Sequence, residues 1–158
     1  MVFQPQESLR VLVVGDSCDD VYHFGTCRRK HPESPALVLL IERSEIRGGM
    51  AANVANNVMS LGIVSDIISN STRPKKERYF DSSYSQQLLR VDTDCYIEPI
   101  SQATLDAIDF TQYSAVLVSD YDKGFLRMAD MVRIADSCVC PVFFDTKKTD
   151  IRELDKDN

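Results

Sequence analysis

The chain has 158 residues, of which 44% are hydrophobic and 27% are charged, a composition typical of one globular domain and unlike that of a disordered or fibrous chain. Its formal net charge of −6 repels phosphate backbones and argues against nucleic acid as a partner. The sequence shows neither an apolar run long enough to cross a bilayer nor a signal-peptide pattern at its start. It therefore predicts a cytoplasmic protein with no membrane partner.

Three short and continuously apolar runs are typical of strands that are buried on both faces of a parallel sheet. They occupy residues 10–15, 115–119 and 141–145, and residues 64–68 are a candidate for a fourth core strand. Because these runs alternate with helical patterns, the predicted fold class is α/β with a parallel sheet.

Apolar residues spaced three and four apart predict the helices of this domain. One helix covers residues 51–61 and ends at Gly62, a residue type that favours helix ends. Ser101 can cap a second, short helix. A third helix carries an apolar stripe formed by Met128, Met131, Val132 and Ala135.

Two stretches, residues 22–46 and 72–95, interrupt this alternation. Both are rich in β-favouring residues around polar turns, and they predict hairpins that build a small sheet projecting from the core. The run at residues 36–41 (ALVLLI) would form a hydrophobic strand, which is an aggregation hazard unless something covers it. We therefore expect a homodimer built by these projecting strands.

The three core strands each lead into an aspartate, namely Asp16, Asp120 and Asp145. Open α/β sheets bind ligands at the carboxyl ends of their strands, so three carboxylates at that edge favour a binding site. For each aspartate alone, the alternative is a residue that caps the following turn or helix.

Gly48, Gly49 and Asn53 surround the start of the helix at residues 51–61. Small residues let a ligand approach the backbone, and a helix N-terminus offers free N–H groups to oxygen or phosphate. The amide of Asn53 suits hydroxyl groups. The alternative interpretation is a tight turn that packs a small-residue helix against a sheet.

The five cysteines are irregularly spaced, and only Cys138 and Cys140 are close enough to suggest a pair of zinc ligands. No second pair accompanies them. We interpret the cysteines as reduced structural thiols, and we expect neither a metal nor a cofactor.

Several motifs follow one another in a recognisable order. They are residues 15–22 (GDSCDDVY), 29–35 (RKHPESP), 48–55 (GGMAANVA), 86–92 (QQLLRVD), 119–124 (SDYDKG) and 141–147 (PVFFDTK). This order resembles that of the ribokinase-like (PfkB) carbohydrate kinases, and most of all that of their heptose-phosphate kinases. The resemblance implies a reduced ribokinase-like, Rossmann-type sheet with a β-sheet lid that also pairs subunits.

The resemblance further implies a site for a small phosphorylated sugar or a nucleotide-like ligand, because carboxylates and amides suit a polyol whereas Arg and Lys suit phosphate. The positions that match sugar-binding residues of the family are Asp20, Gly48, Gly49 and Asn53, and the matching basic positions are Arg29, Arg90 and Lys123. Asp16 and Asp120 at the sheet edge complete the predicted set of ligand-binding residues.

The chain also departs from the family pattern. Family members are longer, and their Gly-Ala-Gly-Asp turn, which supplies the catalytic base and the anion hole, has no counterpart here, since no glycine follows Gly124. We therefore expect one truncated domain over residues 1–158, with its core at residues 10–21, 47–70 and 100–150. Because phosphoryl transfer depends on the groups around the phosphates, we expect no catalytic residues.

Three functions are compatible with these features. The first is non-catalytic binding of the phosphorylated ligand, for sequestration, sensing or regulation. The second is a sugar-binding subunit of a carbohydrate kinase that another chain completes. The third is a docking partner that modulates a full-length kinase.

Overall fold

The computed structural model describes residues 9–154, and the chain divides into two compact units. Unit 2 consists of Cys18–Arg47 and Pro74–Asp94, and unit 1 contains Gly48–Arg73 together with the chain up to Ser17 and from Cys95 onward. The chain leaves unit 1 at Cys18 rather than after residue 21, because the strand that begins at Ser17 runs without a break into the sheet of unit 2.

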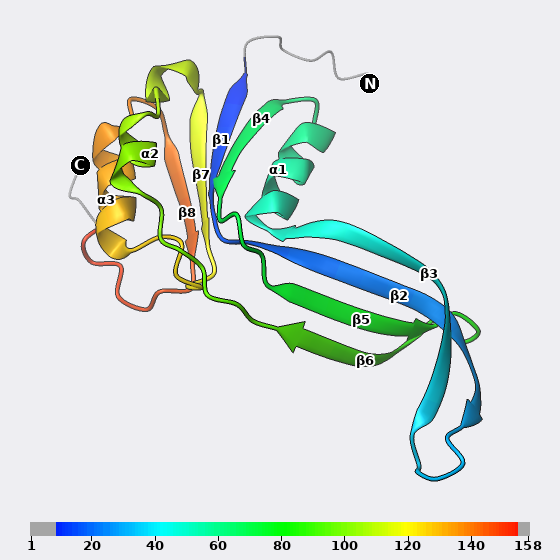
Figure 1. The fold of residues 1–158 in the computed structure, drawn as a ribbon. Helices are drawn as coiled ribbons and strands as arrows, with labels where there is room; N and C mark the ends of the chain where they lie inside the picture. Colours follow the sequence, from blue (N-terminus) through cyan, green and yellow to red (C-terminus); the bar gives the residue numbers. More distant parts are fainter. Residues whose placement is uncertain (1–8, 155–158) are drawn as a thin grey trace. The chain divides into compact units, whose positions relative to one another are not determined.

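Unit 1 is built on a parallel sheet of four strands, in the order β4-β1-β7-β8 (Figure 1). The strands are β1 (Arg10–Gly15), β4 (Val64–Ser69), β7 (Ala115–Asp120) and β8 (Val142–Thr146). The predicted α/β class and all four predicted core strands are therefore confirmed. The central strand β1 is apolar and buried on both faces, as its continuous Val and Leu run indicates.

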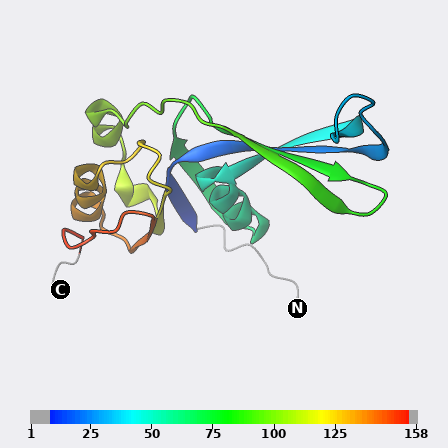
Figure 2. The ribbon, with the colours of Figure 1, turned by 90° about the horizontal axis from the view of Figure 1, so that it is seen from below.

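Helices cover both faces of this sheet, as Figures 1 and 2 show. α1 (Ala51–Ser60) packs on one face, and α2 (Gln102–Asp106) and α3 (Met128–Ser137) pack on the other, with the short 3-10 turn η1 (Phe110–Gln112) nearby. Side chains alternate along the strands. The α1 face buries Val11, Val13, Ala51, Ala55 and Val58, while the opposite face buries Leu12, Val14, Val116, Val118, Met131 and Ile134.

The predicted inward stripe of the third helix is partly wrong. Met131 is buried, but its buried apolar neighbour is Ile134, whereas Val132 and Ala135 are only half-buried. The buried residues of α3 are Met131, Ile134 and the polar residue Asp130. The apolar pattern alone could not identify this buried face, because such a pattern places a carboxylate on the solvent side of the helix.

Unit 2 is a second sheet of four strands, in the order β3-β2-β5-β6. Its strands are β2 (Ser17–Lys30), β3 (Leu37–Met50), β5 (Lys75–Asp81) and β6 (Gln86–Thr93). β5 pairs in parallel with β2 and antiparallel with β6. The two stretches expected to form the lid thus do form one sheet.

Every cysteine of the chain is a free thiol. Cys138 and Cys140 pack against the core beneath α3, and burial, followed by the neighbouring Cys140, raises the pKa of Cys138 to about 12. Within residues 9–154, no three His, Cys, Asp or Glu side chains are grouped so that they could hold a metal ion. No helix in this part of the chain is long and apolar enough to span a membrane.

A buried carboxylate joins α2 to α3. Asp130 is 1% exposed and accepts hydrogen bonds from the backbone N–H of Arg127, from the Arg127 guanidinium and, at 3.0 Å, from Gln102 Nε2. Burial alone would raise the pKa of Asp130, but the bonds from Arg127 and Gln102 outweigh it and hold that pKa below its usual value.

This lowered pKa predicts a specific acid sensitivity. Asp130 should contribute stability that is complete above its unfolded pKa of about 3.9 and is lost as the pH falls through the lower folded value. We expect Asp130→Asn to lower the free energy of unfolding at neutral pH by about 1–3 kcal/mol and to flatten its acid dependence. Urea titrations over a pH series measure both effects. The exposed control Glu98→Gln should change the free energy by less than about 0.5 kcal/mol, and equal losses in the two variants would contradict this role.

Candidate functional site

The carboxyl edge of the unit 1 sheet is organised around Asp16. Its buried carboxylate accepts backbone N–H groups from Tyr121 at 2.7 Å, Phe125 at 3.2 Å and Lys123 at 3.3 Å. Burial raises the pKa of Asp16 although these three bonds oppose the shift. The carboxylate oxygens are thus occupied by the loop at residues 121–125, and Asp16 is an anchor for that loop.

Asp120 is also buried and engaged. Its carboxylate accepts from the backbone N–H of Asp122 at 3.0 Å and from Thr146 Oγ1 at 2.6 Å, and Lys148 Nζ lies 3.2 Å away. Neither Asp16 nor Asp120 therefore has a carboxylate that is open to solvent. We expected both to bind ligand, but the structure gives them hydrogen bonds within the protein.

The third aspartate of the predicted edge is not part of this group. Thr146 lies opposite Asp120 in the register of β7 and β8, and Asp145 lies opposite Ser119. Because successive side chains of a strand point to opposite faces, Thr146 reaches Asp120 whereas Asp145 is exposed on the other face. Asp16 and Asp120 thus lie together at this edge. The hydroxyl of Thr146, and not the carboxylate of Asp145, contacts Asp120.

The turn before α1 has a strained backbone conformation. Met50 precedes the helix with φ 57° and ψ −128°, in the positive-φ region that side chains disfavour, and its side chain does not cap the helix. A Cβ on Gly48 would lie 2.7 Å from the Cβ of Ala52, so this position requires glycine. Backbone strain of this kind is frequent at functional sites.

Asn53 lies in the first turn of α1 and is exposed. The backbone N–H of Ala51 is taken by the carbonyl oxygen of Asp16 at 2.9 Å, whereas the next N–H groups of a first turn have no partner within their helix. N–H groups and an amide at one helix end can donate to hydroxyl or phosphate oxygens. Asn53 is thus exposed at the start of the helix, whereas Gly49 is buried in the turn.

In unit 2, Asp20 lies at the start of β2 and forms a half-buried ion pair with Arg78 of β5. Arg78 was not predicted as a site residue. The sequence near Arg78 shows only that Lys76 and Arg78 alternate along a strand. The ion pair with Asp20 depends on the register of β2 and β5, which places Asp20 opposite Lys76 and Tyr22 opposite Arg78. A guanidinium that pairs with a carboxylate in this way also orients it.

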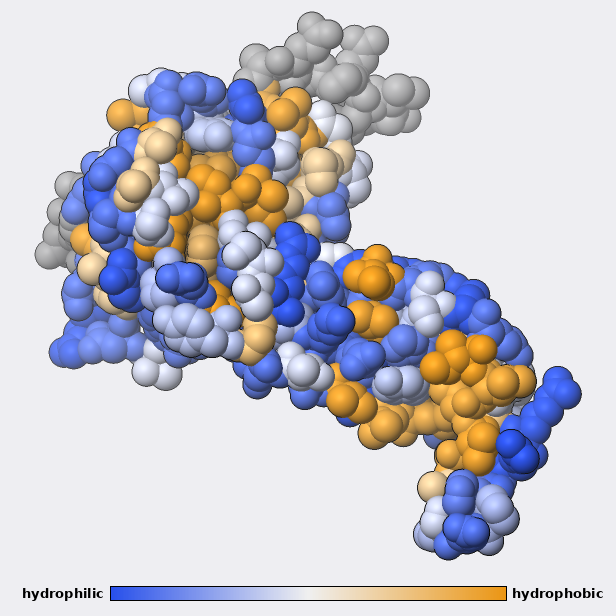
Figure 3. Space-filling view, viewed as in Figure 1, coloured by the Kyte–Doolittle hydropathy of each residue, from blue (hydrophilic) through white to orange (hydrophobic). Residues whose placement is uncertain are grey.

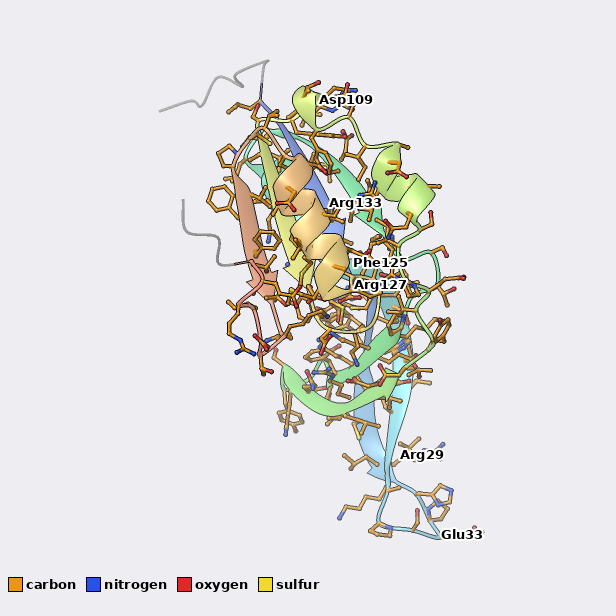
Figure 4. The ribbon with its side chains drawn as sticks, turned by 90° about the vertical axis from the view of Figure 1, so that its left-hand side faces the viewer. Arg29, Glu33, Asp109, Phe125, Arg127 and Arg133 are labelled. Carbon is orange, nitrogen blue, oxygen red and sulfur yellow. The ribbon has the colours of Figure 1, made fainter. Side chains whose placement is uncertain are left out.

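The predicted basic residues Arg29 and Arg90 belong to unit 2, and Lys123 belongs to unit 1. Arg90 is exposed and binds Asp92 through two bonds of 2.6 Å, and it lowers the pKa of Asp92. Arg29 lies nine positions beyond Asp20 on β2, about 30 Å along an extended strand, near the loop that contains Glu33 (Figure 4). Lys123 is exposed in the loop that Asp16 anchors. Arg29 is thus too distant from Asp20 to share a small ligand within unit 2.

Comparison with known proteins confirms the resemblance that the motifs indicate. The chain is 34% identical to the D-beta-D-heptose 7-phosphate kinase of Bordetella bronchiseptica, over 87% of this chain and 54% of that protein. It is 33% identical to the bifunctional protein HldE of Nitratiruptor sp., over 87% of this chain and 36% of that protein. The chain thus spans about half or less of the length of these curated relatives. No family model matches it.

Solved structures show the same fold. A possible 1-phosphofructokinase from Thermotoga maritima superposes with a TM-score of 0.59 at 12% identity, covering 92% of this chain and 55% of its own. The ribokinase of Arabidopsis thaliana, solved with ribose and ATP, gives 0.56 at 13% identity and covers 90% and 55%. The fold is therefore ribokinase-like, and the chain is homologous to part of a heptose 7-phosphate kinase.

Substitution of the buried Asp16 should lower the free energy of unfolding much more than substitution of the exposed Asp145. Asp16→Asn replaces one acceptor oxygen by an amide that cannot accept, so buried N–H groups lose their partner and the free energy of unfolding should fall by about 1–3 kcal/mol. The matched change at an exposed aspartate, Asp145→Asn, should alter the free energy of unfolding by less than about 0.5 kcal/mol. Urea denaturation gives both values, and a stable Asp16→Asn variant would show that this carboxylate is not an anchor.

Proposed function

We propose that this chain binds a phosphorylated sugar of the heptose 7-phosphate class and, by itself, does not transfer phosphate to it. The observation that carries the proposal is the strained Gly48–Gly49–Met50 turn, which leads into an α1 N-terminus with an exposed Asn53 and no side-chain cap. The homology to heptose 7-phosphate kinases supplies the substrate class. In unit 1, Gly48, Gly49 and Asn53 serve the sugar hydroxyls.

The hydrogen bonds of Asp16 and Asp120 support the proposal that the chain does not transfer phosphate. A general base must be free to take a proton from the attacking hydroxyl. Asp16 and Asp120 are buried and occupied by N–H, hydroxyl and ammonium donors, so neither can act as that base without breaking the edge of the sheet. In this proposal the chain is a sequestering, sensing or regulatory binder.

Calorimetry with heptose 7-phosphate, other sugar phosphates and nucleotides tests the binding. We expect Asn53→Ala to weaken sugar-phosphate binding by about 1–3 kcal/mol, because hydrogen bonds to ligand hydroxyls are lost. Asn57→Ala changes the same side chain one turn later on α1, where Asn57 is exposed, and should leave the affinity unchanged. Equal affinity in the Asn53→Ala and wild-type proteins would argue against the site.

An assay of ADP release from ATP, with the same sugar phosphates, tests the second half of the proposal. Sustained ADP production by the purified chain would contradict a non-catalytic role. Transfer that begins only when a second polypeptide is added would instead support the subunit interpretation. One observation favours that alternative: Phe143 on β8, the outermost strand of the described sheet next to β7, is 58% exposed, as an apolar side chain would be if another polypeptide covered it.

We propose in addition that the chain forms a homodimer through one face of the unit 2 sheet. Leu40 and Ile46 of β3 are 69% and 71% exposed, and Leu89 of β6 is 55% exposed. Register and alternation place them on the face that also holds His23 and Tyr79. Figure 3 shows hydrophobic side chains gathered over this sheet. A second copy would cover them symmetrically.

The double substitution Leu40→Lys with Ile46→Lys should produce a monomer, because two buried ammonium groups without partners would oppose the interface. Light scattering coupled to size exclusion measures the mass. The control Val139→Lys adds a charge at a valine of unit 1 that is 78% exposed, and it should leave the mass unchanged. A dimer that persists in the double variant, or a monomeric wild-type protein, would exclude this interface.

A further inference from the structure

Strands β2 and β3 continue as a two-stranded ribbon past the rest of the unit 2 sheet (Figure 1). β5 pairs with β2 from Asp19 to Gly25, so the part of β2 after Gly25 has β3 as its neighbour in the described sheet. We call residues 26–41, which form this ribbon and its connecting loop, the hairpin arm. A ribbon of two strands has no further layer against which it can bury apolar side chains.

Two contacts determine how the strands of the hairpin arm are aligned. His23 Nδ1 lies 2.8 Å from Ser44 Oγ, and the backbone N–H of His31 donates to the carbonyl oxygen of Ala36 at 2.8 Å. The same number of positions separates these two contacts on either strand, so the ribbon between them contains no net bulge. The alternation of side chains therefore continues unbroken along the arm.

One face of the hairpin arm combines apolar and basic side chains. The guanidinium of Arg43 lies 3.8 Å from the ring centroid of Phe24, so these two residues share a face. Alternation places on that face Thr26, Arg28 and Lys30 of β2 and Leu37, Leu39 and Ile41 of β3. Leu37 and Ile41 are 54% and 47% exposed, and Arg28 and Lys30 are exposed as well. This face is opposite to the one proposed for the homodimer.

The hairpin arm is basic although the whole chain is acidic. It contains three cations, Arg28, Arg29 and Lys30, and one carboxylate, that of Glu33, which gives it a formal charge of +2 on a chain whose net charge is −6. Figure 4 shows Arg29 and Glu33 toward the end of the arm. The three cations form no ion pair within residues 9–154, whereas the other arginines of unit 2 each bind a carboxylate. Exposed cations without a carboxylate attract an anionic surface.

Basic and apolar side chains of the hairpin arm also adjoin one cavity. This cavity has a volume of about 350 Å³ and is lined by Thr26, Arg28, Arg29, Val38, Leu39 and Leu40. Its wall on β3 is apolar, while its wall on β2 carries two guanidinium groups. An amphiphile with an apolar chain and an anionic headgroup matches both walls.

We infer that the hairpin arm binds the surface of an anionic lipid bilayer. Leu37 and Ile41 enter the boundary between the headgroups and the acyl chains. Arg28 and Lys30 extend to the acidic headgroups, because their long side chains can lie along apolar neighbours and keep the charge in water. A nucleic acid would use the cations but leave the leucines in water, so the apolar half of this face favours a bilayer.

Binding at a bilayer surface needs no membrane-spanning segment. The expectation of no membrane partner rested on the length of the apolar runs and the start of the chain, and the exposed side chains of the hairpin arm were not considered in it. The inference thus revises that expectation for the surface of a membrane.

A tryptophan probe tests the insertion, because the chain contains no tryptophan of its own. With vesicles of equal parts phosphatidylglycerol and phosphatidylcholine at low ionic strength, we expect the fluorescence of Leu37→Trp to shift to shorter wavelength as the ring leaves water. The control Leu61→Trp places a ring at a leucine of unit 1 that is 69% exposed, and its emission should not change. The absence of a shift in Leu37→Trp, or an equal shift in both variants, would overturn the inference.

Flotation with the same vesicles tests the cations. We expect Arg28→Gln with Lys30→Gln to weaken binding by at least about tenfold, because each cation near an anionic surface contributes about a factor of five. Arg133→Gln with Arg152→Gln makes the same change of net charge at two exposed arginines of unit 1 and should weaken binding less than about twofold. Equal losses in the two double variants would contradict a specific role of the arm. Thermal unfolding verifies that each variant remains folded.

Three further measurements separate a bilayer from other partners. Vesicles of pure phosphatidylcholine should not bind the wild-type protein, and excess inorganic phosphate should not release it from the anionic vesicles, since a free anion cannot replace the apolar contact. Binding to a DNA duplex without binding to vesicles would overturn the inference. A change from dimer to monomer in Leu37→Ser with Ile41→Ser, measured by light scattering, would also overturn it, because a second copy would then cover this face.

Discussion

The buried carboxylate at the end of β1 is the contact on which the geometry of unit 1 depends. Asp16 holds the loop at residues 121–125 through three backbone N–H groups, and its carbonyl oxygen accepts the N–H of Ala51 where α1 begins. The next residue, Ser17, is bound by the side chain of Asn70 through its N–H and its carbonyl. One short segment thus joins the ends of β1, β4 and β7 to the start of α1. The strained turn at Gly48 and Gly49 keeps its shape because the neighbouring backbone is held by these hydrogen bonds.

Most of the fold follows from local patterns, whereas the partners of the polar side chains do not. Continuous apolar runs predicted three of the four strands of unit 1, and Ser101 caps α2 through the N–H of Thr104 as its residue type indicates. The face of the sheet on which Asp145 lies could not be predicted from local patterns. It depends on whether Asp145 or Thr146 faces Asp120, and a shift of one residue along β8 would exchange them.

The pairing of Asp20 with Arg78 illustrates a second limit. The two residues are 58 positions apart, and nothing in the sequence near either one indicates which strands are neighbours or how they are aligned. The resemblance to carbohydrate kinases supplied Asp20, but not the arginine that orients it. The stacking of Tyr22, Phe24 and Phe80 was overlooked for the same reason, since these rings come from β2 and β5 and are brought together only by the register of the two strands.

The strand order of unit 1 also has a consequence for the biosynthesis of the chain. β1 lies between β4 and β7, and its residues pair with residues of β7 that are about a hundred positions further along the chain. At typical elongation rates of about 5–20 residues per second, β1 therefore waits roughly 5–20 s for that neighbour. During this interval β2 and β3 are already made, and they carry the exposed leucines of the lid. The nascent chain is then most in need of a chaperone, and synonymous codon changes that slow translation between Thr93 and Ala115 would lengthen that period.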